Sequence, residues 1–332
     1  MELYVSIKKR LRDFVLEVEF TTRDEVFALL GASGCGKSMT LKIIAGIEKP
    51  DSGKIILNRR TLFDSDKKIN LPPQERRVGY LFQNYALFPN MTVAENILFA
   101  AVGTKDEKIF KLKENLARFK LKGLEKSYPH ELSGGQAQRV AFARVLASHA
   151  QILLLDEPFS ALDSHLKWQL ELELAEVFKI YGAAILVSHD RTEVFRLADR
   201  VAVINAGKLE ASGSKHEIFQ RPPTKAAALL TGCQNISAAK KIADDKIFAE
   251  DWQLTLTVKK IPDDLKFIGI HAHALEIGSE IGENIFPFEV IGVVEEPLNF
   301  VVTLRAAKEA LPLRWQADKN LRITNEEIFL RG

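Results

Sequence analysis

The chain has 332 residues, which is enough for about two domains. Hydrophobic residues make up 46% and charged residues 27%, as is typical of a soluble protein with a hydrophobic core. The 46 Lys and Arg residues nearly balance the 44 Asp and Glu residues, so the net charge of +2 gives no indication of a protein that coats polyanions.

The cysteine content and the hydropathy of the chain indicate the compartment in which the protein works. The two cysteines, Cys35 and Cys233, cannot form a disulfide framework and fit a reducing compartment. No apolar stretch reaches the roughly 18 residues that a membrane-spanning helix needs. The first residues scatter charges where a signal peptide would have an apolar core. These features predict a soluble, cytoplasmic protein.

Short apolar runs alternate with helical patterns in the first two thirds of the chain. Residues 16–20 alternate between apolar and acidic, which predicts a half-buried strand, and 25–30 (EVFALL) predict a second strand. Residues 39–47 have a helical pattern that ends near Gly46. Four further apolar runs, bounded by polar residues or turns, occur at 78–82, 152–155, 184–187 and 201–204. Such runs between helices predict an α/β domain with a parallel sheet covered on both faces.

The strand pattern is interrupted once and then changes. Helical patterns dominate residues 84–150, where Pro89 and Pro129 divide a predicted helical subdomain. From about residue 232, short alternating strands such as 254–258 and 300–304 predict a small β-barrel or sandwich. The predicted domains are therefore 1–231 and 232–332. The tail from residue 233 has 12 Lys and Arg against 16 Asp and Glu, a net charge of −4, which argues against nucleic acid as a partner.

A glycine-rich segment follows the second predicted strand. GASGCGKS fits the pattern G-x-x-x-x-G-K-[ST] between a strand and a helix, which is typical of a loop that binds nucleoside phosphates. Gly34 and Gly36 allow a sharp turn, Lys37 brings charge to the phosphates, and Ser38 offers a hydroxyl to Mg²⁺. The alternative is a glycine-rich turn with an exposed lysine. The predicted nucleotide contacts are Gly31, Ala32, Ser33, Gly34, Cys35, Gly36, Lys37, Ser38 and Met39.

Two carboxylates follow the apolar run at 152–155. The run predicts a central strand that ends at the sheet edge where ligands of α/β proteins bind. Asp156 is suited to hold Mg²⁺ through water, and Glu157 to polarise an attacking water. The alternative is an exposed acidic turn that Pro158 closes.

Four further segments resemble motifs of the ABC-type ATPases, in the family's order along residues 1–230. Leu132–Gln136 (LSGGQ) is similar to the signature sequence, Gln83 to the Q-loop glutamine, Ser160–Asp163 (SALD) to the D-loop, and His189 to the switch histidine. The resemblance implies that ATP and Mg²⁺ bind between two copies of the chain. It implies catalytic roles for Glu157, His189 and Gln83, magnesium ligation by Ser38, Gln83 and Asp156, and contacts to the other copy's nucleotide from Ser133, Gly134, Gly135, Gln136 and Asp163.

Plainer interpretations of these residues stay open. Ser133 is also a suitable helix cap, His189 could be a core histidine, and Gln83 an ordinary loop residue. Met39 stands where many relatives have Thr, which removes one hydroxyl near the α-phosphate. Phe14 is the candidate for stacking on adenine, with core packing as its alternative, so the base contact is unassigned.

A transport ATPase without a membrane span needs separate membrane partners. The resemblance implies two integral-membrane permease subunits, an extracytoplasmic solute-binding protein, and a peripheral location on the cytoplasmic face of the membrane. The docking surface is predicted near Tyr85, Phe88, Pro89 and Met91, with local core as the alternative. Competing classes are a non-transport ABC ATPase that acts on nucleic acid or ribosomes, and an ATP-gated scaffold that does not hydrolyse.

The tail resembles the OB- or TOBE-like C-terminal domains of importer ATPases, most closely those for molybdate. Residues 269–277 and 283–306 carry this resemblance, which implies molybdate or tungstate as the cargo. ATPases for sulfate, polyamines, sugars and ferric iron have a similar layout and remain alternatives. His271 and His273 are predicted to share one face of a strand, either as ligands or as solvated side chains.

Overall fold

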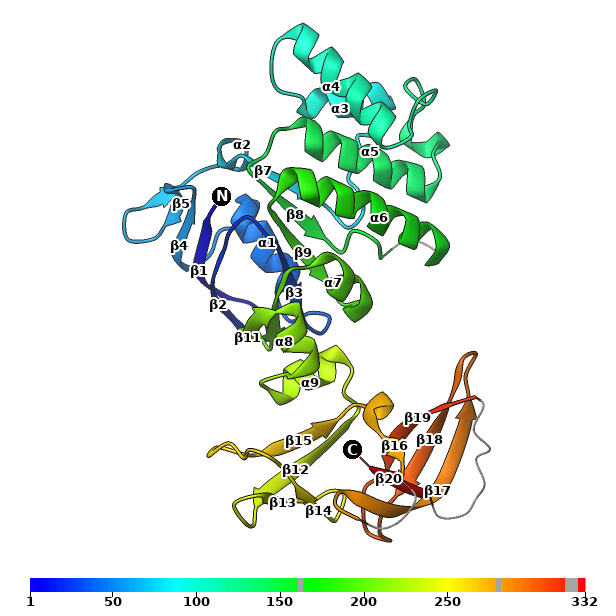
Figure 1. Ribbon diagram of the computed structural model, residues 1–332. Coiled ribbons are helices and arrows are strands. Elements are labelled where there is room, and N and C mark those ends of the chain that lie inside the picture. The colour runs from blue at the N-terminus through cyan, green and yellow to red at the C-terminus, as the bar shows by residue number, and fades with distance from the viewer. Residues whose placement is uncertain (161–163, 279–281, 320–327, 332) are drawn as a thin grey trace. The chain divides into compact units, whose positions relative to one another are not determined.

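The computed structural model describes residues 1–160, 164–278, 282–319 and 328–331 (Figure 1). The chain divides into two compact units, Met1–Gln220 and Arg221–Gly332. The helix α9 (Lys225–Thr231) thus belongs by its contacts to the second unit, although its sequence pattern continues the first. The predicted domain boundary between residues 231 and 232 stays a prediction.

The described part of the first unit contains an eleven-stranded sheet. Its strands are β1 (Leu3–Arg10), β2 (Val15–Thr22), β3 (Val26–Leu30), β4 (Ser52–Leu57), β5 (Arg60–Asp64), β6 (Ile69–Asn70), β7 (Val78–Leu81), β8 (Ile152–Asp156), β9 (Ala184–Ser188), β10 (Arg200–Asn205) and β11 (Lys208–Ser214). They lie in the order β6-β5-β4-β1-β2-β11-β10-β3-β9-β8-β7. The half from β10 to β7 is parallel, as the sequence predicts, whereas β1, β2, β4, β5 and β6 pair antiparallel with one another. Between the two halves, β11 pairs parallel with β2 and antiparallel with β10.

The burial of the strands explains their sequences. All five residues of β3, β8 and β9 are buried, as continuous apolar runs require in a parallel sheet with both faces covered. In β2, by contrast, buried and exposed residues alternate. Because β3, β8 and β9 run parallel and in register, Leu30, Asp156 and Ser188 end at the same edge. The loops that follow them therefore meet there.

The helices of the first unit are α1 (Lys37–Ala45), α2 (Pro73–Arg76), α3 (Val93–Ala100), α4 (Lys105–Arg118), η1 (Pro129–Glu131), α5 (Gly134–Ala147), α6 (Ser164–Tyr181), α7 (Arg191–Leu197) and α8 (Lys215–Gln220). The predicted helical subdomain is present: α5 packs against α3 and α4, and Figure 1 shows these three helices gathered beside the sheet. No helix within the described ranges is both long and apolar enough to cross a bilayer.

A buried arginine anchors α1 at its C-terminal end. Arg76 is fully buried and donates hydrogen bonds to the carbonyls of Ile43 (2.8 Å) and Ile44 (2.9 Å). Gly46 ends the helix with φ 80°, and a Cβ at this position would lie 2.5 Å from Arg76 Nε. The guanidinium therefore occupies the space that the glycine leaves, and it adds hydrogen bonds to two carbonyls of the last helical turn.

The second unit is almost entirely β-structure, as the sequence predicts. Its elements after α9 are β12 (Asn235–Lys241), β13 (Lys246–Ala249), β14 (Leu254–Thr257), β15 (Phe267–Ile270), η2 (Ala272–Ala274), β16 (Glu276–Ile277), β17 (Ile285–Glu295), β18 (Asn299–Arg305), β19 (Leu313–Asp318) and β20 (Ile328–Arg331). Two sheets, β14-β13-β12-β15 and β16-β20-β17-β18-β19, enclose a core that includes Trp252 and Trp315.

The prediction that His271 and His273 lie on a strand is wrong. The strand β15 ends at Ile270, and the chain turns into η2, where Ala274 N donates to His271 O over 2.9 Å. The two rings still lie close together, with centroids 5.3 Å apart. Local hydrogen bonding in a turn thus replaces the strand that the alternating residues suggest.

Candidate nucleotide site

The glycine-rich loop connects β3 to α1, and its geometry requires glycine at three places. Gly34 and Gly36 have φ values of 78° and 109°, in the left-handed region that side chains disfavour. At Gly31 a Cβ would lie 2.4 Å from the carbonyl oxygen of Ile204. The loop therefore brings bare backbone to the N-terminus of α1, an arrangement that binds phosphates well.

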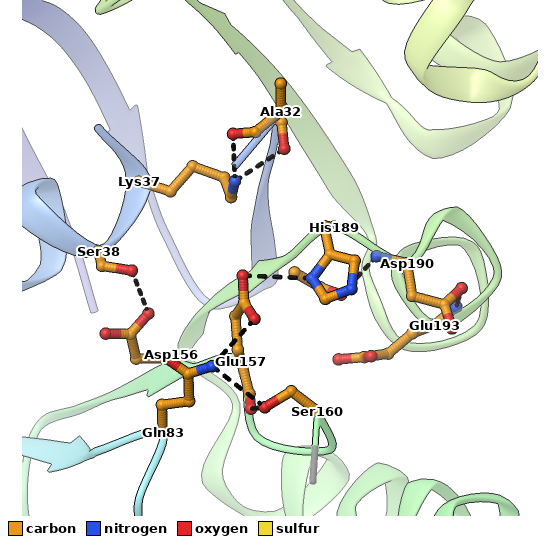
Figure 2. Close-up of polar contacts among 12 residues, drawn as sticks. Ala32, Lys37, Ser38, Gln83, Asp156, Glu157, Ser160, His189, Asp190 and Glu193 are labelled. Carbon is orange, nitrogen blue, oxygen red and sulfur yellow. Dashed lines mark hydrogen bonds and ion pairs between the residues drawn. The ribbon is translucent and has the colours of Figure 1, made fainter. Parts of the chain in front are cut away.

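The side chain of Lys37 lies across this loop. It is 4% exposed, and its Nζ donates to Gly31 O over 2.7 Å and to Ala32 O over 2.9 Å (Figure 2). Its ammonium group also lies 3.9 Å from Cys35 Sγ. The exposed lysine of the alternative interpretation is therefore ruled out, because the loop backbone holds the charge in place.

Asp156 lies at the end of β8 and receives two hydroxyl groups. Ser38 Oγ donates to its Oδ1 over 2.6 Å, and the Tyr80 hydroxyl donates to its Oδ2 over 2.8 Å. The carboxylate is buried, so it is not part of an exposed acidic turn. A hydroxyl beside a carboxylate is a set of hard oxygen ligands that fits Mg²⁺, and the side-chain oxygen of Gln83 is a further candidate. Burial, followed by the charge of Asp156, raises the pKa of Tyr80, which keeps this hydroxyl a donor.

Glu157 joins three loops into one cluster (Figure 2). Gln83 Nε2 lies 3.4 Å from its Oε2, and His189 Nδ1 lies 3.2 Å from its Oε1. The backbone of Glu157 is left-handed, with φ 47°, a costly conformation that clusters at functional sites. His189 is 60% exposed, which excludes a core histidine. The structure thus brings Gln83, Glu157 and His189 together as the sequence predicts, and it adds Ser160, whose Oγ lies 3.4 Å from Gln83 Nε2.

A charged cluster is formed by Asp190, the residue after His189, with Lys167 and Glu193. Asp190 caps α7, and Lys167 of α6 contacts Asp190 Oδ2 over 2.5 Å and Glu193 Oε2 over 3.4 Å. Burial raises the pKa of Glu193 to about 7, although Lys167 opposes this effect. One oxygen of Glu193, Oε1, has no hydrogen-bond partner. The cluster was not predicted from the sequence, because Lys167 lies far along the chain from Asp190 and Glu193.

The segment that resembles the signature lies on a different element from the loop. Ser133 caps α5: its Oγ accepts from Gln136 N over 3.3 Å, and its own N–H donates to Gln136 Oε1 over 2.9 Å. Ser133 and Gly134 are exposed at the helix start, whereas a Cβ on Gly135 would lie 2.3 Å from Leu166 Cδ2. Ser133 is therefore a helix cap, as the plainer interpretation has it. The start of α5 at Ser133 and Gly134 is nevertheless exposed. Asp163 lies outside the described residues.

Phe14, the candidate for stacking on adenine, and Met39, the last residue of the predicted nucleotide-binding loop, both contact the core. Phe14 is half-buried, and a Cβ on Gly36 would lie 3.6 Å from its ring. Phe14 and Met39 both pack against the buried cluster of the first unit. The position of Phe14 beside the loop suits adenine stacking, but its packing equally fits the core alternative.

The predicted docking residues are only partly exposed. Tyr85, Phe88 and Met91 are half-buried, while Pro89 is exposed. Arg144 of α5 donates to Tyr85 O and Ala86 O, each over 2.7 Å, so the local-core interpretation holds for much of this segment. Larger apolar exposure occurs in the same helical subdomain at three residues that were not predicted from the sequence: Phe99 (64%), Val102 (59%) and Phe110 (69%).

Comparison with known proteins identifies the family. Residues 16–160 match the model of the ABC transporter family. A spermidine/putrescine import ATP-binding protein, PotA, from Clostridioides difficile is 37% identical over 275 residues, which cover 78% of this chain and 76% of that protein. The chain belongs to the ATP-binding proteins of ABC transporters. This membership confirms the resemblance that the motifs carry.

Other relatives of this ABC protein agree on the family. PotA of Acidothermus cellulolyticus is 44% identical over 219 residues, and the putrescine transport protein PotG of Escherichia coli is 41% identical over 221 residues. These matches cover 65% and 64% of the chain, which spans only 56% of the length of each of these two relatives. All three relatives are named for polyamines, so the comparisons do not support the molybdate prediction.

Solved structures also match about two thirds of the chain. The dimeric structure of MJ0796, a bacterial ABC transporter cassette, has a TM-score of 0.55 and 27% identity, and it covers 65% of this chain and 99% of that one. A second structure of that cassette, in a post-hydrolysis state bound to ADP and phosphate, has a TM-score of 0.55 and 26% identity over the same shares. The fold prediction is therefore confirmed.

Proposed function

We propose that this chain binds ATP with Mg²⁺ and hydrolyses it to energise an ABC importer. The observation that carries the proposal is the convergence of Lys37, Asp156 and the Gln83–Glu157–His189 cluster at one sheet edge. A loop that only binds phosphate would need Lys37 but neither Asp156 nor the Gln83–Glu157–His189 cluster.

Each residue has a role that follows from its position. The loop amides and Lys37 bind the phosphates, and Ser38, Asp156 and Gln83 hold the metal, which neutralises charge on the phosphates when bound. Glu157 accepts a hydrogen bond from the attacking water and orients it toward the terminal phosphate. His189, in contact with Glu157 Oε1, holds that carboxylate in place.

The second half of the site comes from another copy of the chain. Ser133, Gly134, Gly135 and Gln136 form an exposed helix start that suits an anion, and they lie on α5 rather than beside Lys37. Two copies facing each other would bring this helix start, with Asp163, to the nucleotide of the partner. The dimeric form of the related cassette supports this arrangement.

The helical subdomain is the proposed contact with the permease subunits. Phe99, Val102 and Phe110 expose apolar surface on the same subdomain as the segment that follows Gln83. A partner helix covering this surface would couple the membrane subunits to Gln83. The chain would then lie peripherally on the cytoplasmic face of the membrane, with a solute-binding protein acting on the other side.

For the cargo we favour a polyamine over molybdate or tungstate. The names of the curated relatives support a polyamine, whereas molybdate rests on the tail alone. Isothermal titration of the solute-binding protein encoded with this chain, against spermidine, putrescine, molybdate and tungstate, separates the two. Heat from the oxyanions alone would reverse the assignment.

Phosphate release from ATP by the purified protein tests the hydrolytic proposal, with Glu157→Gln as the matched variant. We expect release by the parent, little release by the variant, and similar affinities of both for a fluorescent ATP analogue. Binding without release by the parent would instead support a scaffold. Rapid turnover by Glu157→Gln would remove this carboxylate from the mechanism.

A further inference from the structure

We propose that Tyr80 is a positioning residue of the magnesium site and holds the Asp156 carboxylate in the orientation that metal binding needs. The inference rests on the proposed function and deepens it. Tyr80 contacts Asp156 through its hydroxyl, so the role is testable by removing one oxygen atom.

The sheet register places Tyr80 beside Asp156. Tyr80 on β7 pairs with Leu154 on β8, and Asp156 follows two residues later on the same face of its strand. The tyrosine side chain spans this offset, and its hydroxyl donates to Asp156 Oδ2 over 2.8 Å. The contact is therefore built by two paired strands, the edge strand β7 and its neighbour β8.

The two oxygens of Asp156 are divided between two donors. Ser38 Oγ, from the first turn of α1, donates to Oδ1 over 2.6 Å, while Tyr80 donates to Oδ2. Because the terminal torsion of an aspartate is broad, a single donor would leave the carboxylate free to rotate. With Oδ2 fixed by Tyr80, Oδ1 stays directed at Ser38, a second candidate ligand of the metal.

The ring of Tyr80 is itself held in place. It lies against Phe82 with centroids 4.4 Å apart, and it packs against the buried cluster of the first unit. A rigid donor behind a ligating carboxylate is the arrangement by which outer partners tune metal sites, and removing such a partner typically weakens metal binding 10- to 100-fold.

The test is Tyr80→Phe, which keeps the ring and removes the hydroxyl. The Mg²⁺ concentration that half-saturates the enhancement of fluorescent ATP binding is measured at a fixed nucleotide concentration. We expect this concentration to rise about tenfold, equivalent to about 1.4 kcal/mol, with unchanged affinity for the nucleotide in the absence of metal. Unchanged or tighter Mg²⁺ dependence would overturn the proposal.

Tyr181→Phe is the matched control. Tyr181 is a part-buried tyrosine of the same unit whose hydroxyl donates to Ala150 O over 2.7 Å, away from Asp156. Its loss should leave the Mg²⁺ dependence unchanged; an equal shift in both variants would overturn the proposal. Tyr80→Met fills similar space without a hydroxyl and serves if the phenylalanine variant does not fold.

Failure of both Tyr80 variants to fold would assign the residue a structural role and also overturn the proposal. A parent protein that binds no ATP, with or without metal, would instead contradict the proposed function. The two failures are therefore distinguishable.

Discussion

Replacing Glu193 with Gln should stabilise the first unit at pH 8 and change its stability by less than about 1 kcal/mol at pH 5. Glu193 lies in α7, four residues after His189, and its side chain is almost completely buried with one oxygen unpaired. Burial raises the pKa of its carboxyl from 4.5 to about 7, against the opposing charge of Lys167 at 3.4 Å. The folded chain therefore favours the protonated form.

The size and sign of the effect follow from this pKa. Between pH 4.5 and 7 the unfolded chain loses the proton while the folded chain keeps it, so the free energy of unfolding falls as the pH rises. At about 1.36 kcal/mol per pKa unit, the loss reaches about 3 kcal/mol above pH 7. Gln does not ionise but keeps only part of the contact with Lys167, so we expect a net gain of about 1–3 kcal/mol at pH 8.

Urea unfolding at both pH values, followed by far-ultraviolet circular dichroism, measures this gain, because α1 to α8 all lie in the first unit. The control is Glu171→Gln: Glu171 is equally buried, but Arg196 pairs with it over 2.5 Å, so its replacement should destabilise at both pH values. A Glu193→Gln variant that is less stable than the parent at pH 8 would refute the reasoning. It would mean that the ionised carboxylate gains more from Lys167 than it loses by burial.

Two further substitutions test the loop and the helix that follows it. Lys37→Ala should weaken binding of a fluorescent ATP analogue at least about tenfold, because it removes the charge that the loop holds at the phosphate site; unchanged affinity would contradict that assignment. Gly46→Ala should lower the free energy of unfolding by about 1–3 kcal/mol, since φ is 80° and the new Cβ would lie 2.5 Å from Arg76 Nε. A urea midpoint equal to that of the parent would show that Arg76 does not fill this space rigidly.

The central strands were predictable from sequence because burial on both faces leaves a clear pattern. The observed β3, β8 and β9 differ from the predicted runs by about one residue at an end. Strands of the antiparallel half were not predicted where Lys and Arg interrupt the apolar pattern, as they do in β1. At His271 and His273 the alternation suggested a strand, but a local turn formed instead.

The functional site was predictable to the extent that motifs mark the ends of parallel strands. Lys37, Asp156 and Glu157 follow recognisable strands, and the sheet brings them together. Tyr80 and the cluster of Lys167, Asp190 and Glu193 were missed, because their contacts depend on strand register and helix packing between distant residues. No local sequence pattern encodes such contacts.

Cross-linking between copies tests most directly whether two chains share each nucleotide. One variant carries Ser33→Cys in the exposed part of the loop, and the other carries Gly134→Cys, where a Cβ meets no atom within 4 Å. The native Cys35 and Cys233 are buried, so a short thiol-specific cross-linker should react mainly at the new sites. Both variants also carry Glu157→Gln, so that ATP persists.

We predict that mixing the two variants with ATP and Mg²⁺ yields a covalent dimer, whereas either variant alone, or a mixture in which both also carry Lys37→Ala, does not. A mixture that binds ATP and yet never forms the cross-link would contradict the shared site.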